Sequence, residues 1–146
     1  MNTVPQYPVI AISPGDSFLV IDEPIVQCSA RGWRNGYFDD LVFFDSAGLL
    51  WPTHASLRNP LSFFDRFRRA IPVDLDFGKP EMEAQAKAVA MLETLIDEDD
   101  SDLYDQFVSR SELKDLFRRA PKPADLIAVA RTLGAGRGPN SEAETS

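Results

Sequence analysis

The first half of the chain has the hydrophobic pattern of short strands separated by turns. Residues 17–22 form a short apolar segment after the turn sequence of residues 14–16, and they predict a strand. Residues 41–44 are a continuous apolar run, which is typical of a strand covered on both faces. Residues 73–77 alternate apolar side chains with aspartates. This pattern predicts a strand with one buried face and one solvent-exposed face.

The segment after the continuous apolar run predicts a hairpin. Asp45 stands at the first position of a four-residue turn, and Gly48 stands where a positive φ is favoured. Residues 49–51 begin the return strand. We expect Pro52 to limit how far that strand can pair, because proline has no amide proton to donate.

Residues 29–36 allow two interpretations. Ser29 can cap a short helix that ends at Gly36, or Asn35 and Gly36 can form a two-residue hairpin turn. The short helix is preferred, because a glycine and two arginines inside the segment make a poor strand. Residues 25–28 before it are expected to extend a second strand.

A helix is predicted at residues 60–70. Asn59 is a suitable N-cap, and Pro60 occupies the first helical position, where its missing N–H costs nothing. From residue 80 onward the pattern becomes helical throughout. Residues 81–96 are rich in alanine, glutamate, methionine and leucine and carry acids in their expected first turn.

Two further helices are predicted in the second half. Ser109 and Glu112 form a capping-box pattern before an apolar stripe, and Pro121 ends that helix. The stripe consists of Leu113, Leu116 and Phe117. The last helix opens at Pro123, and its apolar residues are Leu126, Ile127, Ala130 and Leu133.

These elements predict an α+β fold. A small, mostly antiparallel sheet from the first 78 residues would be packed by helices from the C-terminal half. Residues 1–133 are expected to form a single domain, which is the usual outcome for a chain of 146 residues. Residues 134–146 contain no large apolar side chain and predict a flexible C-terminal tail.

Composition narrows the function classes. The net charge of −8 and the pI near 4.6 disfavour nucleic-acid binding, which depends on lysine and arginine, and they suit a basic partner. A single cysteine, Cys28, cannot form an internal disulfide and fits a reducing compartment. No apolar run approaches the ~20 residues that a membrane helix needs, and the N-terminus lacks the pattern of a signal peptide. We therefore expect a cytoplasmic protein without a membrane segment.

The strongest charge feature is an acidic run between two predicted helices. Six acids occur in the nine residues 97–105, with no base among them. This run is interpreted either as a solvated connector or as a docking surface for a basic protein. It lacks the glycine and the spaced glutamate of an EF-hand. The candidate partner-binding residues are Asp97, Glu98, Asp99, Asp100, Asp102, Tyr104 and Asp105.

The hairpin also carries polar side chains of the types that occur in catalytic and metal-binding sites. The expected register brings His54 near Asp39 or Asp40, so a histidine–carboxylate pair can form there. Asp45 has a competing structural role, because its carboxylate can accept hydrogen bonds from its own turn. Cys28 lies in an apolar segment and is expected to be buried. The common catalytic and phosphate-binding motifs do not occur, so no catalytic residue, metal or cofactor is assigned.

The sequence NGYFDDLVFFDSAGLLW, residues 35–51, resembles a part of small acidic bacterial immunity proteins, which neutralise toxins from neighbouring cells. The resemblance covers a strand, an Asp-x-x-Gly turn and a strand that ends in tryptophan. It implies a non-enzymatic inhibitor that sits over a basic toxin surface. The resemblance does not identify any individual functional residue in this chain.

Three functions remain for comparison. The leading hypothesis is a non-enzymatic protein-binding module, of the immunity type, that blocks a basic toxin or another basic partner through its acidic surface. The alternative is a hydrolase or metal-dependent enzyme that uses Asp39, Asp40 and His54. The third is a structural or assembly subunit joined through its apolar helices, so homo-oligomerisation stays open.

Overall fold

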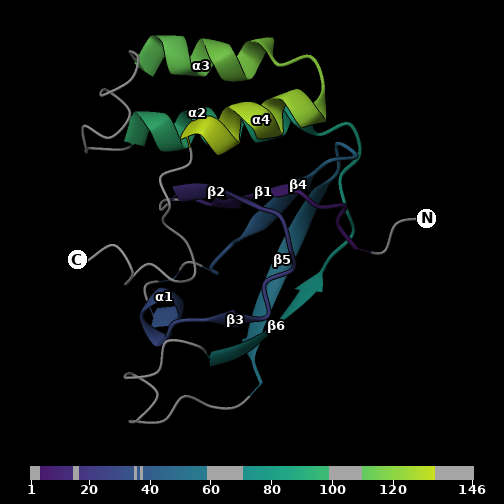
Figure 1. The fold of residues 1–146 in the computed structure, drawn as a ribbon, viewed down its shortest axis with the longest axis vertical. Coiled ribbons are helices and arrows are strands. Elements are labelled where there is room, and N and C mark those ends of the chain that lie inside the picture. The colour runs from purple at the N-terminus through teal and green to yellow at the C-terminus, as the bar shows by residue number, and fades with distance from the viewer. Residues whose placement is uncertain are drawn as a thin grey trace.

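The computed structural model combines an antiparallel sheet with helices packed at one end (Figure 1). This confirms the predicted α+β class. The described residues are 4–14, 17–34, 36, 38–58, 71–98 and 110–133. The predicted helix 60–70, the Ser109 cap, the tail 134–146 and most of the acidic run, residues 99–105, lie outside these ranges.

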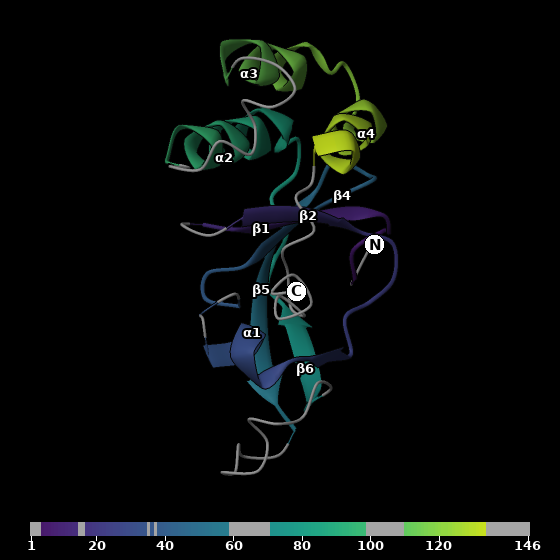
Figure 2. The ribbon, with the colours of Figure 1, turned by 60° about the vertical axis from the view of Figure 1, so that its left-hand side comes forward.

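Within the described residues the sheet has six strands in the order β2-β1-β4-β5-β6-β3, and every neighbouring pair is antiparallel. Their bounds are β1 Val9–Ser13, β2 Ser17–Ile21, β3 Gln27–Cys28, β4 Val42–Asp45, β5 Leu50–Leu57 and β6 Ile71–Phe77. The sheet is curled, and the long strand β5 runs from the β1–β2–β4 half to the β6–β3 half (Figure 2).

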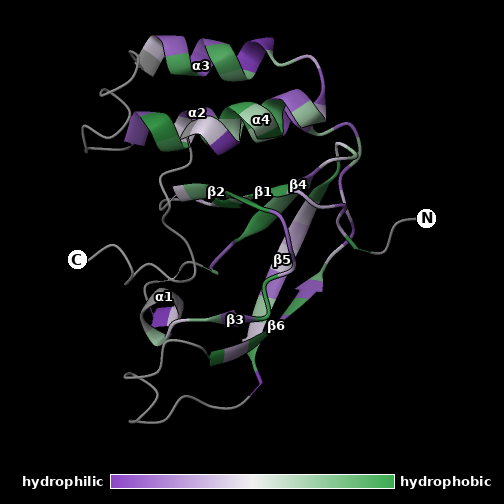
Figure 3. Cartoon of the chain, viewed as in Figure 1, coloured by the Kyte–Doolittle hydropathy of each residue, from purple (hydrophilic) through white to green (hydrophobic). Residues whose placement is uncertain are grey.

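The strand β1 lies next to the edge strand β2 and was missed by the sequence pattern, although all five of its residues are buried. Ile10 and Ile12 point into the core beneath the helices, whereas Val9 and Ala11 point into the core inside the curl. Because both faces are covered, the strand shows no alternation of polar and apolar residues (Figure 3). The nearby prolines, Pro8 and Pro14, obscured the short apolar run between them.

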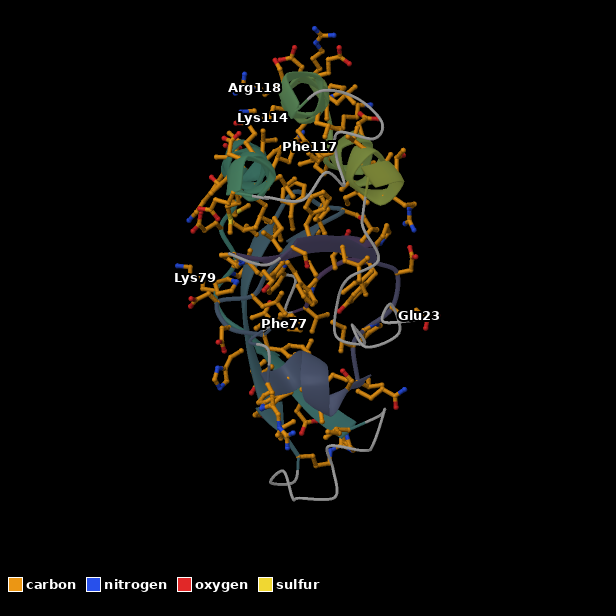
Figure 4. The ribbon with its side chains drawn as sticks, turned by 90° about the vertical axis from the view of Figure 1, so that its left-hand side faces the viewer. Glu23, Phe77, Lys79, Lys114, Phe117 and Arg118 are labelled. Carbon is orange, nitrogen blue, oxygen red and sulfur yellow. The ribbon has the colours of Figure 1, made fainter. Side chains whose placement is uncertain are left out.

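In the described part of the chain, three helices cover one face of β1 and β2 (Figures 1 and 2). They are α2 Gln85–Glu98, α3 Arg110–Arg119 and α4 Pro123–Leu133. α2 and α4 contact the sheet, and α3 packs on both of them from outside. Phe117 of α3 points inward between these helices (Figure 4) and meets Phe18 of β2 edge to face, with 5.9 Å between ring centroids. Leu116, predicted to face the core, is instead 43% exposed.

A second core fills the inside of the curl. Phe43 of β4 and Trp51 of β5 lie opposite each other in the strand register, and both contact Phe77 of β6. The short helix α1, Ala30–Arg34, covers this core from the side with Trp33. The predicted short helix is therefore confirmed, and Gly36 follows it with a φ of 81°.

Two predicted boundaries were wrong. α2 begins at Gln85 rather than at Glu81, because Glu81 pairs with Leu50 of β5 through two backbone hydrogen bonds. Pro52 was predicted to limit the return strand, but β5 continues to Leu57 and pairs with β6 over its last five residues, and the N–H of Thr53 still donates to Leu41 on the β4 side. Within the described ranges, no helix has the length and apolar character that crossing a membrane requires.

Candidate functional site

The carboxylate of Asp45 is structural. Asp45 is fully buried at the end of β4, and its Oδ1 accepts hydrogen bonds from the N–H groups of Ala47 and Leu49 at 3.0 and 2.9 Å. Its Oδ2 accepts the N–H of Gln6 at 3.1 Å and the indole N–H of Trp51 at 2.9 Å. The turn interaction expected from the sequence is confirmed, and this aspartate has no place in a reactive site.

A hollow lies beside the hairpin where the chain approaches β4. Asp40 has a φ of 54°, which turns the chain away from the strand direction just before Leu41. The carbonyl of Leu41 still accepts the N–H of Thr53 at 2.9 Å, so β5 has a neighbour up to this point. Beyond it the two chain segments diverge, and a hollow with a volume of about 770 Å³ opens between them.

The hollow brings together the three residues of the predicted hairpin cluster. It is lined by Trp33, Phe38, Asp39, Asp40, Leu41, Val42, Pro52, Thr53, His54 and Ala55. Asp39, Asp40 and His54 are all exposed and line this one hollow. Among the described residues, however, His54 forms no hydrogen bond or ion pair with either carboxylate.

The chemistry of the hollow is acidic and aromatic. Two carboxylates line it, and its described lining includes no lysine or arginine. Trp33 and Phe38 contact each other at its side, with ring centroids 5.4 Å apart. The described part of the chain holds no group of three potential metal ligands. Two carboxylates and an indole ring that line one hollow are suited to a cationic side chain, because both kinds of group attract positive charge.

The acidic run begins at the end of α2, where the structure describes only its first two members. Asp97 accepts a hydrogen bond from the Nζ atom of Lys114 on α3 at 2.6 Å. Glu98 is exposed and, among the described residues, has no ion pair. Asp99, Asp100, Asp102, Tyr104 and Asp105 lie outside the described ranges, so their docking role stays a prediction.

The acids and bases of the helical end form several internal ion pairs. Arg118 of α3 pairs with Glu93 of α2, parallel to the Lys114–Asp97 pair. Lys114 and Arg118 both lie on the outer surface near α2 (Figure 4). The carboxylate of Glu93 raises the pKa of the Arg118 guanidinium through a hydrogen bond and charge attraction. These contacts hold α3 against α2 and neutralise cations of α3.

Two further ion pairs tie strands to their neighbours. Arg131 of α4 donates two hydrogen bonds to Asp22 after β2, and Arg58 donates one to Asp74 of β6. In each pair the hydrogen bond from the guanidinium lowers the pKa of the aspartate. Both aspartates are exposed, so these pairs are part of the ordinary surface rather than of a reactive centre.

Cys28 is fully buried in the core inside the curl, as expected for a structural cysteine. Sequence reasoning missed two members of the hollow, Trp33 and Phe38. In the sequence they are only two aromatic residues near the end of the short helix. The fold was needed to show that they line the same hollow as His54. No family model, curated protein or solved structure matches the chain.

Proposed function

We propose that the chain is a non-enzymatic binding module for a basic protein, as an immunity-type inhibitor would be. The acidic surface, defined as residues 97–105, would cover a positively charged surface of the partner. Charge complementarity of this kind raises the association rate and selects the partner. The proposal rests on the surplus of acids at the helical end after its internal ion pairs are considered.

Residues 81–120 contain eleven acids and five bases, a balance of −6 within a total of −8. Four of these bases, Lys87, Lys114, Arg118 and Arg119, already pair with one acid each inside the fold. The acids in those pairs are Glu81, Asp97, Glu93 and Asp115. The segment contains seven other acids, and five of those seven belong to residues 98–105.

The pairing of Asp97 changes its expected role. Its partner, Lys114, has a side chain that is 25% exposed, whereas the side chain of Asp97 is 57% exposed. Asp97 therefore contributes first to the contact between α2 and α3. The acids from Glu98 onward are better candidates for contact with a partner, because the described cations of α3 already have other acids beside them.

The test is a binding experiment with charge variants. The intact chain serves as bait, and a captured basic protein is identified, purified and titrated by calorimetry at about 50 and 200 mM salt. We expect the triple variant E98Q/D99N/D100N to weaken binding by about tenfold at low salt and to flatten the salt dependence.

The matched control removes the same charge elsewhere. The triple variant E23Q/E83Q/D125N changes three exposed acids that lie outside residues 97–105, and it should bind within about twofold of the parent chain. Equal weakening by both triple variants would show that only net charge matters. Unchanged binding by E98Q/D99N/D100N at low salt would remove the acidic surface from the proposal.

A second candidate function is hydrolysis at the hollow. It is favoured by one observation, that His54, Asp39 and Asp40 line the same concave surface. Such a site would use His54 as the general base and a carboxylate to orient it. Turnover of p-nitrophenyl acetate or phosphate that H54Q abolishes, in a variant that still folds, would support it. Turnover unchanged by H54Q would exclude His54 chemistry.

A further inference from the structure

We propose that the hollow receives an extended segment of the basic partner, which pairs with the open edge of β5 and places an arginine or lysine against Asp39 and Asp40. This inference deepens the proposed binding function and rests on it. It adds a second contact, distinct from residues 97–105, and it specifies the backbone conformation and side chain of the occupant.

The open edge follows from the direction of the backbone hydrogen bonds in β5. The carbonyl of Pro52 accepts the N–H of Gly78 at 2.8 Å and therefore faces the β6 side. The N–H of Thr53 donates to Leu41 at 2.9 Å and faces the β4 side. Because alternate residues of a strand present their N–H groups to the same side, the N–H and carbonyl of Ala55 also face the β4 side.

At Ala55 the β4 side has no strand. Pairing between β4 and β5 ends at Val42 and Pro52, and Asp40 turns the preceding chain away. Ala55 itself lines the hollow. Among the described residues, its outward N–H and carbonyl therefore face the hollow without a ladder partner. An extended peptide can satisfy such groups by adding as a strand.

The side chains around this edge select a cation. Asp39 and Asp40 are exposed at the hollow, and neither has an ion pair with another described residue. Trp33 lines the same hollow, and an indole ring attracts a guanidinium or ammonium group. Arginine fits best, because its planar guanidinium group can stack on an aromatic ring and donate hydrogen bonds to a carboxylate at the same time.

The probe is a capped five-residue peptide of valine and threonine with a central arginine, titrated into the full chain. A matched peptide carries citrulline, which has the same shape without the charge. We expect the arginine peptide to bind at least about fivefold more tightly at low salt. Its binding should shift the Ala55 amide resonance, slow exchange of that amide and change the fluorescence of Trp33.

Backbone pairing is tested by methylating peptide nitrogens one at a time. Because pairing uses alternate residues, methylation at one of two consecutive positions should weaken binding by about fivefold, while its neighbour has little effect. Equal effects at both positions, or an unperturbed Ala55 amide, would overturn strand addition. Equal binding of the arginine and citrulline peptides would overturn the cation site.

Protein variants separate this inference from the proposed acidic surface. D39N/D40N should weaken peptide binding by about fivefold, whereas the charge-matched control E23Q/D125N should not. E98Q/D99N/D100N should leave peptide binding unchanged while it weakens binding of the whole partner. If peptide binding persists but the acidic-surface variants bind the partner normally, the hollow stands and the surface proposal fails. If D39N/D40N binds the peptide as tightly as the parent does, the proposed peptide site in the hollow is wrong. The acidic-surface proposal is not affected by that result.

Discussion

Asp45 shows how a single buried carboxylate can define a hairpin. Its two oxygens accept four hydrogen bonds, from the turn that follows it, from Gln6 and from the indole of Trp51. We expect D45A to lower the free energy of unfolding by about 3–5 kcal/mol, because it leaves several buried donors without acceptors. Urea denaturation monitored by circular dichroism measures this loss.

The matched comparison for Asp45 is another aspartate of the same sequence segment. Asp39 is exposed and lines the hollow, so D39N should change the free energy of unfolding by less than about 0.5 kcal/mol. A D45A protein as stable as the parent would contradict the structural role of the carboxylate. It would also reopen Asp45 as a candidate for chemistry at the hairpin.

At the scale of the element, α3 contains a matched pair of leucines. Leu113 is fully buried against the other helices, and Leu116, one turn along, is 43% exposed. We expect L113A to cost about 2–5 kcal/mol of unfolding free energy, because it leaves a cavity in the core. L116A should cost less than about 1 kcal/mol. Similar losses in the two variants would mean that α3 packs with a different face.

The tie between β2 and α4 gives an element-scale dependence on pH. Arg131 lowers the pKa of Asp22 in the folded chain, so the ion pair stabilises the fold at pH values above the unfolded pKa of about 3.9. That contribution is lost as the pH falls through the lowered, folded pKa. The variant R131Q should therefore be less stable than the parent at neutral pH, and the difference in unfolding free energy should narrow as the pH falls below about 3.9.

Denaturation midpoints of the parent and R131Q between neutral and acidic pH test this dependence. K122Q removes a cation just before α4 that, among the described residues, forms no ion pair. The difference in denaturation midpoint between K122Q and the parent should not change as the pH falls. A gap between R131Q and the parent that stays constant down to about pH 2 would contradict the assigned linkage.

The sequence predicted the elements whose signals are local. The turn at Asp45, the short helix after Ser29 and the start of α4 at Pro123 depend on capping and turn residues that are neighbours along the chain. α2 was predicted too long, because a backbone pairing with β5 competes for Glu81. That competition is tertiary and leaves no local pattern.

The hollow was predictable only in part. The turn register placed His54 near Asp40, since both positions are counted from the same hairpin. The open edge at Ala55 depends on the positive φ of Asp40 and on the side of β5 that β6 occupies. Neither feature is indicated by the residue types, so the open edge could be identified only from the backbone pairing in the structure.

At the scale of the whole molecule, one sheet carries two cores that share their strands. Phe44 of β4 packs under the helices, while its neighbour Phe43 packs inside the curl. The same division holds for Leu50 and Trp51 of β5. A strand cannot leave one core while it stays in the other. The two cores are therefore expected to unfold as one cooperative unit, which is what the single domain predicted for residues 1–133 requires.

The variant L92A tests this cooperativity, because Leu92 is fully buried in the helix-side core alone. It should remove about 2–5 kcal/mol of unfolding free energy. In a W33F background, fluorescence of Trp51 reports the core inside the curl, and far-ultraviolet circular dichroism reports the helices. If β1, β4 and β5 couple the cores, L92A moves both denaturation midpoints together. A fluorescence transition that stays at the parent midpoint while the helical signal shifts would mean that the helices fold as a separate unit on the sheet.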